Sequence, residues 1–340
     1  MTHHRIALRV RYRVPVRDHW TGVLTSSTPL VVESSRDRFM LEALCDPGPV
    51  DCYDYEPDAI FRAYLFDDVS AAVFQVLEGR DDADETIEDS DDGPEVYCEE
   101  YIAYLREAAA RINRLSTSAL DLLLWRGRIR AGPADLNADP FRLHWVRLTP
   151  QDRGSSVHDL GWCQVPFGEM ALHLPDMDAL DLRTEVAADL SGLLDAHIRA
   201  PLGQVLMREA WRNRESNLRS ALVMAVAAVE TGAKEFVARA APDAAWLVEN
   251  LQSPPLHKIL ADYLPTLPSR CGQADFVPPI PESWRMVLKR GVEDRNKVVH
   301  GRDIELDADM IERLLATSLD LLYFLDYHSG YGWAQAGDAE

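Results

Sequence analysis

The sequence has 340 residues and a formal net charge of −21, with 47% hydrophobic and 27% charged residues. This length exceeds what one hydrophobic core usually serves, so we expect two domains. The composition excludes fibrous and wholly disordered proteins. The strong negative charge disfavours a protein that coats nucleic acid through many phosphate contacts.

The chain shows no sign of a membrane partner or of export. Its first residues lack an apolar signal segment, and no stretch approaches the length of a membrane span. The five cysteines include no CxxC pair, which predicts reduced thiols. We therefore expect a cytoplasmic location.

Much of the acid lies in residues 81–100, which hold eleven carboxylates and no basic residue. Such a run repels itself and predicts a solvated loop. A cation-binding segment or a mimic of nucleic acid is the alternative.

The first part of the chain mixes strands with a helix. Residues 5–14 alternate apolar and basic side chains, the pattern of a half-buried strand, and residues 141–148 repeat it. Shorter strands are expected at 162–165 and 170–174, and apolar residues at helical spacing predict a helix over 95–115. Residues 1–175 are thus predicted to form an acidic α+β accessory or sensor domain, with a protein or a small ligand as its possible partner.

Strand-like alternation ends after Pro175, and the rest of the sequence is helical in pattern. Residues 176–204 are interpreted as a helical linker. Ser216 or Asn217 can cap a long helix, and Gly301 can end a later one that begins near residue 282. A capping box at Asp309 predicts a final helix. We expect an all-α bundle over residues 205–330, followed by a tail at 331–340.

One short segment carries the residue types of an RNA-cleaving site. Arg295 is followed by the polar Asn296 and, after four intervening residues, by His300. Cleaving RNA without a metal requires proton transfer to and from oxygen and positive charge at the phosphate. His300 can exchange a proton near neutral pH, and Arg295 can bind two phosphate oxygens.

The spacing also assigns a role to Asn296. Arg295 and His300 are five positions apart, about 140° around an ideal helix, whereas Asn296 and His300 share a face. Asn296 is therefore predicted to orient His300 or a phosphate. The alternative is an Arg295 paired with Asp294 or Glu293 and a His300 that only caps the helix.

This segment and its setting between two long helices resemble the HEPN family, in particular its Apea-like ribonuclease type. The helix that runs from Arg219 through Glu230 resembles the family's first long helix. The resemblance implies a metal-independent endoribonuclease without a cofactor, with Arg295, His300 and Asn296 in the active site and Glu230 holding Arg295. It further implies a homodimer that brings a second Arg and His to the same phosphate.

The resemblance also implies RNA as the substrate and a role as a toxin or phage-defence effector. Some HEPN domains bind without cutting, so the alternative is a non-catalytic dimer that binds RNA, a nucleotide or a protein. A structural dimerisation domain is a third interpretation. No family is recognised for residues 1–175.

Further basic residues are candidates for binding RNA. Arg208, Arg212 and Arg219 lie close to one helical face, and Lys297 lies within the motif itself. Residues 125–130 form a short basic and aromatic patch that is either a second RNA contact or a solvated turn. The spacing of His144, His158, Cys163 and His173 matches no zinc-ligand pattern, so no metal site is expected.

Overall fold

A computed structural model describes residues 3–21, 29–46, 58–79, 98–128, 141–150, 152, 157, 160–170, 177–181, 183–250 and 255–335. The chain divides into two compact units. The first consists of Met1–Leu123 and Asp135–Arg199, and the second of Leu124–Ala134 and Ala200–Glu340. No helix in the described ranges is long and apolar enough to cross a membrane.

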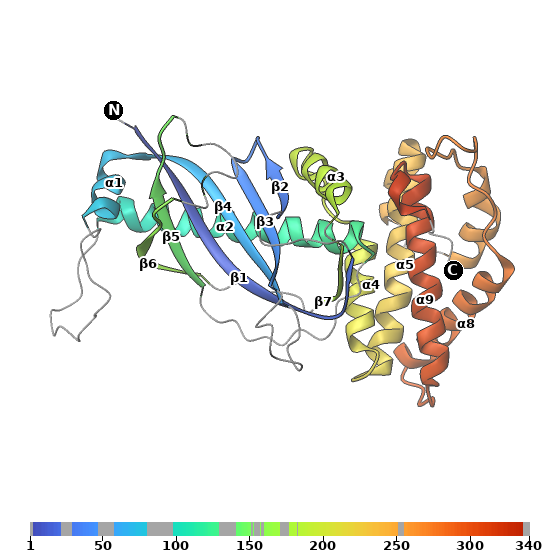
Figure 1. Cartoon of the computed structure of the whole chain (residues 1–340). Coiled ribbons are helices and arrows are strands. Elements are labelled where there is room, and N and C mark those ends of the chain that lie inside the picture. The colour runs from blue at the N-terminus through green and yellow to red at the C-terminus, as the bar shows by residue number, and fades with distance from the viewer. Residues whose placement is uncertain are drawn as a thin grey trace. The chain divides into compact units, whose positions relative to one another are not determined.

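The first unit is built on an antiparallel sheet (Figure 1). Its strands pair in the order β2-β3-β4-β1-β5-β6, and β7 pairs in parallel with the end of β1. Their bounds are β1 His3–Thr21, β2 Leu30–Ser34, β3 Phe39–Asp46, β4 Asp58–Ser70, β5 Phe141–Arg147, β6 Cys163–Met170 and β7 Met177–Asp181. The helices are α1 Ala71–Glu78, the first part of α2 Glu99–Arg126, and α3 Thr184–Asp195.

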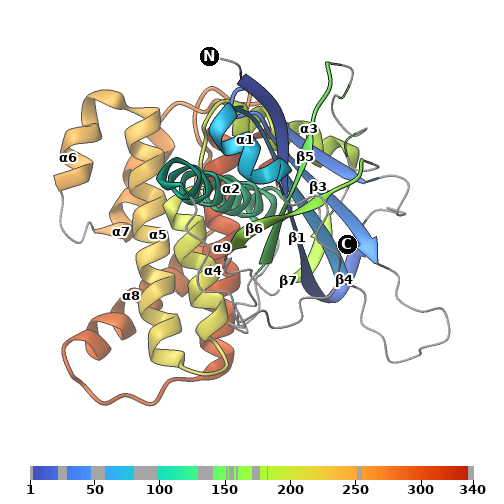
Figure 2. The same ribbon diagram turned by 90° about the vertical axis from the view of Figure 1, so that its left-hand side faces the viewer.

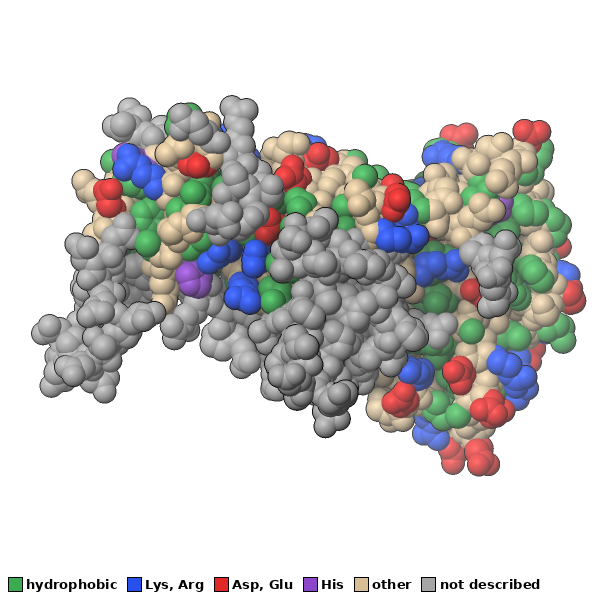
Figure 3. Space-filling model, viewed as in Figure 1, with side chains coloured by type: hydrophobic (Ala, Val, Ile, Leu, Met, Phe, Trp, Pro, Cys, Tyr) green, Lys and Arg blue, Asp and Glu red, His purple; other side chains and the backbone are tan. Residues whose placement is uncertain are grey.

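Strand alternation gives this sheet one apolar face and one mixed face. Ile6, Leu8, Val10 and Tyr12 of β1 are buried on the face along which α2 runs in both ribbon views (Figures 1 and 2). Arg111 of α2 donates to Asp67 of β4 at 3.0 Å. The opposite face carries basic side chains of β1, and Lys and Arg side chains gather there beside a histidine (Figure 3).

The second unit is a helical bundle, which agrees with the predicted fold class of an α+β region followed by helices (Figure 2). Its long helices are α4 Leu202–Asn213, α5 Leu218–Ala240, α8 Glu282–Val299 and α9 Ala308–His328. Shorter pieces are η2 Pro242–Ala244, α6 Ala245–Asn250, α7 Leu256–Lys258, a π-helical turn η3 Ile259–Tyr263, η4 Leu264–Thr266 and η5 Gly332–Ala334. Helix α5 contacts α4, α8 and α9 and is the centre of this core.

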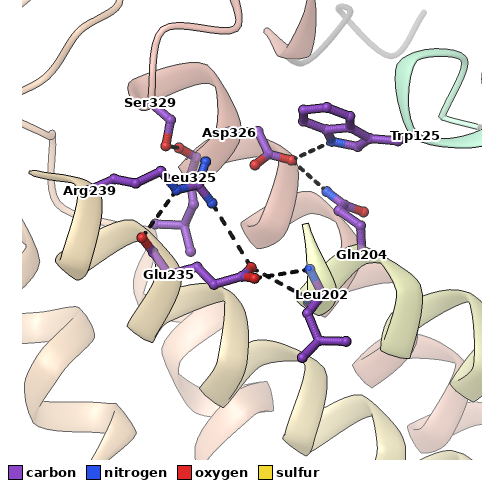
Figure 4. A network of polar contacts seen from close by, with 9 residues as sticks. Trp125, Leu202, Gln204, Glu235, Arg239, Leu325, Asp326 and Ser329 are labelled. Atoms are coloured by element: carbon purple, nitrogen blue, oxygen red, sulfur yellow. Dashed lines mark hydrogen bonds and ion pairs between the residues drawn. The ribbon is translucent and has the colours of Figure 1, made fainter. Parts of the chain in front are cut away.

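A buried polar network ties the helices of this unit together (Figure 4). The Asp326 carboxylate accepts from the indole N–H of Trp125 and from the Gln204 amide, each at 2.8 Å. Glu235 of α5 accepts from the Leu202 N–H at 3.0 Å and so caps the start of α4. Trp125 is thus a buried anchor, although residues 125–130 were also interpreted as an RNA contact.

Several sequence predictions are confirmed and others need correction. Asn217 caps α5 through its side chain, as expected. The final helix is capped by Asp307 rather than by the predicted box at Asp309, because the Asp307 carboxylate accepts from the Asp309 N–H. Strand β7 and helix α3, which fall in the predicted linker 176–204, belong to the first unit; Ser191 of α3 accepts from the Glu33 N–H of β2 at 3.0 Å.

Candidate active site

Helix α8 presents the Arg–His segment at its C-terminal end. The helix begins after Pro281, and Gly301 ends it with a φ of +74°. The Gly301 N–H donates to Val298 at 3.0 Å, and the Arg302 N–H donates to Lys297 at 2.9 Å, which is the pattern of a glycine-terminated helix. The predicted stop at Gly301 is therefore confirmed, and it leaves His300 exposed at the helix end.

A cavity of about 600 Å³ opens beside this segment. One side is the face of α8 on which residues recur every three or four positions, and the other sides are α5 and the segment that leads into η3. The lining residues are Glu230, Pro255, Leu256, His257, Leu260, Arg285, Leu288, Lys289, Val292, Glu293, Arg295, Asn296, Val299 and His300. The fold thus brings the four predicted active-site residues, Arg295, His300, Asn296 and Glu230, to one cavity.

Glu230 and Arg295 form an ion pair between α5 and α8. Their side chains are only 18% and 17% exposed. A partly buried carboxylate beside a guanidinium limits the rotamers of the arginine and leaves its remaining N–H groups to point elsewhere. The arginine is therefore held in place at the cavity wall.

Arg295 pairs with Glu230 of α5 and not with Asp294, its alternative partner within α8. Asp294 accepts from Lys297 at 2.7 Å and lies 3.7 Å from Arg290, on a different face of the helix from the cavity. Asp294 is buried and satisfied by these two cations. Arg295 is therefore directed toward Glu230 and the cavity.

Asn296 and His300 are both exposed and both line the cavity. Their direct contact is through the backbone, where the Asn296 carbonyl accepts from the His300 N–H at 3.1 Å. This bond fixes the position of His300 relative to the last turn of α8. Both side chains face the same space, as their spacing predicts.

Three further basic or titratable residues of the cavity escaped the sequence analysis. Arg285 and Lys289 precede Asn296 on the same face of α8, so the helical repeat of 285, 289, 292, 296 and 299 is the signal that identifies them. His257 comes from α7, far away in sequence. No spacing rule connects it with His300, because only the fold of the proline-bounded segment places it there.

The predicted RNA-binding residues lie elsewhere. Arg208 is only 8% exposed and packs with Gln204, Met207, Trp211 and Tyr323 around a separate small cavity. Arg219 pairs with Asp303 at 2.6 Å, and Lys297 is engaged with Asp294. Neither these three nor Arg212 lines the large cavity. A helical-wheel pattern cannot tell a buried arginine from an exposed one, which is why Arg208 was misplaced.

The chemistry of the cavity is that of proton transfer and positive charge. It combines two histidines with three permanent cations and two carboxylates, of which Glu230 is already paired. Within the described part of the chain, no three His, Cys, Asp or Glu side chains are grouped so that they could hold a metal ion. His158 and His173, two of the four residues considered for zinc, lie outside the described residues.

Comparisons of the chain with protein families, with curated proteins and with solved structures found no match.

Proposed function

We propose that this protein is a metal-independent endoribonuclease of HEPN type. The observation that carries the proposal is the single cavity that gathers Arg295, Asn296 and His300 from α8 with Glu230 from α5. An Arg–polar–His spacing occurs by chance in many proteins, so by itself it is weak evidence for a nuclease. The cavity adds the spatial arrangement that such chemistry requires.

In the proposed reaction, the 2′-oxygen of the RNA attacks the adjacent phosphorus and the bond to the 5′-oxygen breaks. The 2′-hydroxyl proton passes to a base, and another proton passes to the leaving 5′-oxygen. The products are a 2′,3′-cyclic phosphate and a free 5′-hydroxyl, so no water or metal-bound hydroxide takes part.

Each cavity residue has a part in this proposal. Arg295, held by Glu230, offsets the charge that develops on the phosphate oxygens, and His300 moves one of the two protons. Asn296 positions the phosphate beside His300. Lys289 and Arg285, which is paired with Glu282, extend this row of basic side chains along α8, where the neighbouring phosphates of a bound strand would lie.

Two groups are candidates for transferring the second proton in this scheme. A homodimer through residues 205–330 would supply the His300 of a second copy, and we adopt this as the proposed assembly. His257 of the same chain is the competing source.

The test is cleavage of single-stranded RNA in the presence of EDTA. His300→Ala and Arg295→Ala should each reduce cleavage by at least about a hundredfold, the usual effect of removing one proton-transfer or charge-stabilising group. Arg290→Ala removes a cation from another face of α8 and should leave cleavage unchanged. Products should carry a cyclic phosphate, and DNA should remain intact.

A purified protein that cuts equally well after both substitutions, or that cuts only with a divalent metal, would contradict the mechanism. The alternative function is a binding module, and it is favoured by the apolar share of the cavity wall, which includes Leu256, Leu260, Leu288 and Val292. Binding of RNA without cleavage under any condition would support that module. The sensor role of the first unit and the role as a toxin or defence effector rest on the resemblance to HEPN proteins.

A further inference from the structure

The mixed face of the sheet in the first unit carries a compact group of arginines. Arg9 and Arg11 alternate onto the same face of β1. Arg11 lies directly opposite Arg62 of β4, and Arg9 lies opposite Tyr64 of β4 and His144 of β5. We call Arg9, Arg11 and Arg62 the arginine cluster. The gathering of basic side chains over β1 is visible in the space-filling view (Figure 3).

The cluster is held by rigid neighbours. The Arg9 guanidinium lies over the Trp162 ring, 4.3 Å from its centroid. Glu42 of β3 is fully buried, accepts from the Tyr64 hydroxyl at 2.7 Å and lies 3.8 Å from Arg62. Glu42 thus lies near Arg62 and also acts on Arg9 through its charge, whereas no carboxylate among the described side chains pairs with Arg11.

The like charges of the cluster are unfavourable as they stand. Cross-strand neighbours have Cβ atoms about 5 Å apart, and like charges directly opposite each other destabilise a sheet. Burial lowers the pKa of Arg9 and the adjacent Arg62 and Arg11 charges lower it further, whereas Tyr64 and Glu42 oppose this shift. The Arg9 Nε atom is buried without a hydrogen-bond partner in the described part of the chain.

This arrangement is notable because the surrounding sequence is rich in carboxylates. The protein has 56 Asp and Glu against 35 Lys and Arg, so partners for surface arginines are abundant. Arg38 and Arg111 of the same unit each pair with an aspartate. Arg11, in contrast, is exposed beside another arginine, and within the described residues no carboxylate pairs with it.

We propose that the arginine cluster binds the phosphate groups of a small ligand of nucleotide size. Guanidinium groups present paired N–H donors that match phosphate oxygens, and one bound anion would replace the repulsion between Arg11 and Arg62 with attraction to both. The exposed Arg11 and the part-exposed Arg62 give the ligand access, and Arg9 supplies the inner wall. The proposal does not depend on the ribonuclease assignment.

A small ligand fits these observations better than a nucleic-acid strand. The cluster spans two adjacent strands, which matches one or two phosphates, whereas a strand gains affinity from many phosphate contacts. The strong negative charge of the whole chain would repel a long polyanion more than a compact one. Binding here would give the first unit a chemical signal to recognise.

The test is calorimetric titration of the full-length protein with pyrophosphate in metal-free buffer of low ionic strength. Saturable binding at one site per chain is expected. Arg11→Gln should weaken it about tenfold or more, the effect of losing a charge-assisted hydrogen bond. Arg147→Gln is the matched control, because Arg147 lies on β5, pairs with Glu78 and is exposed over 63% of its side chain, and Arg11 is exposed as well.

A second readout guards against a variant that merely unfolds. Without ligand, Arg11→Gln should keep or raise the melting temperature, since it relieves repulsion with Arg62. With pyrophosphate, the wild-type melting temperature should rise and that of the variant should not. Comparing tripolyphosphate with ATP then distinguishes an inorganic from a nucleotide ligand.

Three outcomes would overturn the proposal. One is the absence of saturable heat with pyrophosphate, tripolyphosphate and ATP alike. Another is an equal loss of binding in Arg147→Gln, which would indicate general charge attraction. A single-stranded DNA oligonucleotide that binds through Arg11 and is not displaced by pyrophosphate would also reject a small-ligand site in favour of a nucleic-acid surface.

Discussion

At the scale of single residues, burial decides which charged side chains a ligand can reach. Arg208 and Arg295 are both arginines on helices of the second unit, yet one is packed among aromatic and apolar side chains and the other lines a cavity. A family resemblance and helical spacing predicted Arg295, Asn296, His300 and Glu230 as candidates, and all four line one cavity. Arg285 and Lys289 were missed although they continue the helical repeat of Asn296, and His257 was missed because local spacing carries no information on long-range packing.

Asp326 provides a residue-scale prediction about pH. It is 4% exposed, and burial raises its pKa from 3.8 to about 6 despite hydrogen bonds from Trp125 and Gln204. Between these two values the folded protein keeps a proton that the unfolded chain has lost. The stabilisation from this group is therefore complete below about pH 4 and is lost as the pH rises through about 6.

Asp326→Asn keeps the shape of the side chain and an oxygen that can accept from both donors, but it removes the buried charge. Its effect on the free energy of unfolding should become more favourable by roughly 3 kcal/mol between pH 4 and pH 7. Chemical denaturation of both proteins at the two pH values measures this difference. Asp320→Asn, on an exposed part of the same helix, should change by less than about 0.5 kcal/mol. Equal effects at both pH values would show that folding does not raise the pKa of Asp326.

At the scale of elements, the regular patterns were the most predictable. Helices α5 and α8 follow the expected starts, and β1 follows the alternation of residues 5–14. Strand β1 continues past Pro15, because the residues that follow pair with β7. Pro15 itself forms the last pair with β4. Helix α2 continues past the expected end near 115, because buried residues, among them Ser116, Leu120 and Leu123, go on recurring at helical spacing.

The crossing of α4 and α5 gives an element-scale prediction. A Cβ on Gly203 would lie 2.9 Å from the Gly232 Cα and 3.0 Å from the Ala228 carbonyl oxygen. These are backbone atoms and cannot rotate away, so Gly203→Ala must separate the helices. The free energy of unfolding should fall by about 1–3 kcal/mol, the usual cost of overpacking.

Urea denaturation followed by circular dichroism measures this loss. The control is Gly192→Ala in α3, where a Cβ would meet nothing within 4 Å. Because alanine favours helix over glycine by up to about 1 kcal/mol, this control should be neutral or stabilising. A Gly203→Ala protein as stable as the control would mean that the two helices can shift apart without cost.

At the scale of the whole molecule, the sequence predicted an α+β region followed by a helical region, and the structure agrees with that order. The strands β2, β3 and β4 were not predicted, because β3 and β4 are largely buried on both faces and their apolar residues therefore do not alternate with polar ones. The two units differ in chemistry as well as in fold. One presents an arginine cluster on a sheet, and the other a cavity with histidines at the end of a helix.

Assembly is the last property that the proposed mechanism requires, because one chain offers only one Arg–His segment. We expect light scattering at micromolar concentration to give a homodimer. If each active site takes a His300 from both chains, a mixed dimer of one wild-type and one His300→Ala subunit holds a single His300 at the shared site. This mixed dimer should then be about as inactive as the His300→Ala homodimer.

His257→Ala supplies the decisive comparison. If the second copy of His300 moves the second proton, His257→Ala should retain most cleavage and the mixed dimer of wild-type and His300→Ala subunits should be inactive. If His257 moves it within one chain, His257→Ala should be as inactive as His300→Ala, and the mixed dimer should keep about half of the wild-type activity, because its wild-type subunit works alone. A monomer in solution that is fully active would reject the shared site, and the cavity of a single chain would then have to carry the whole reaction.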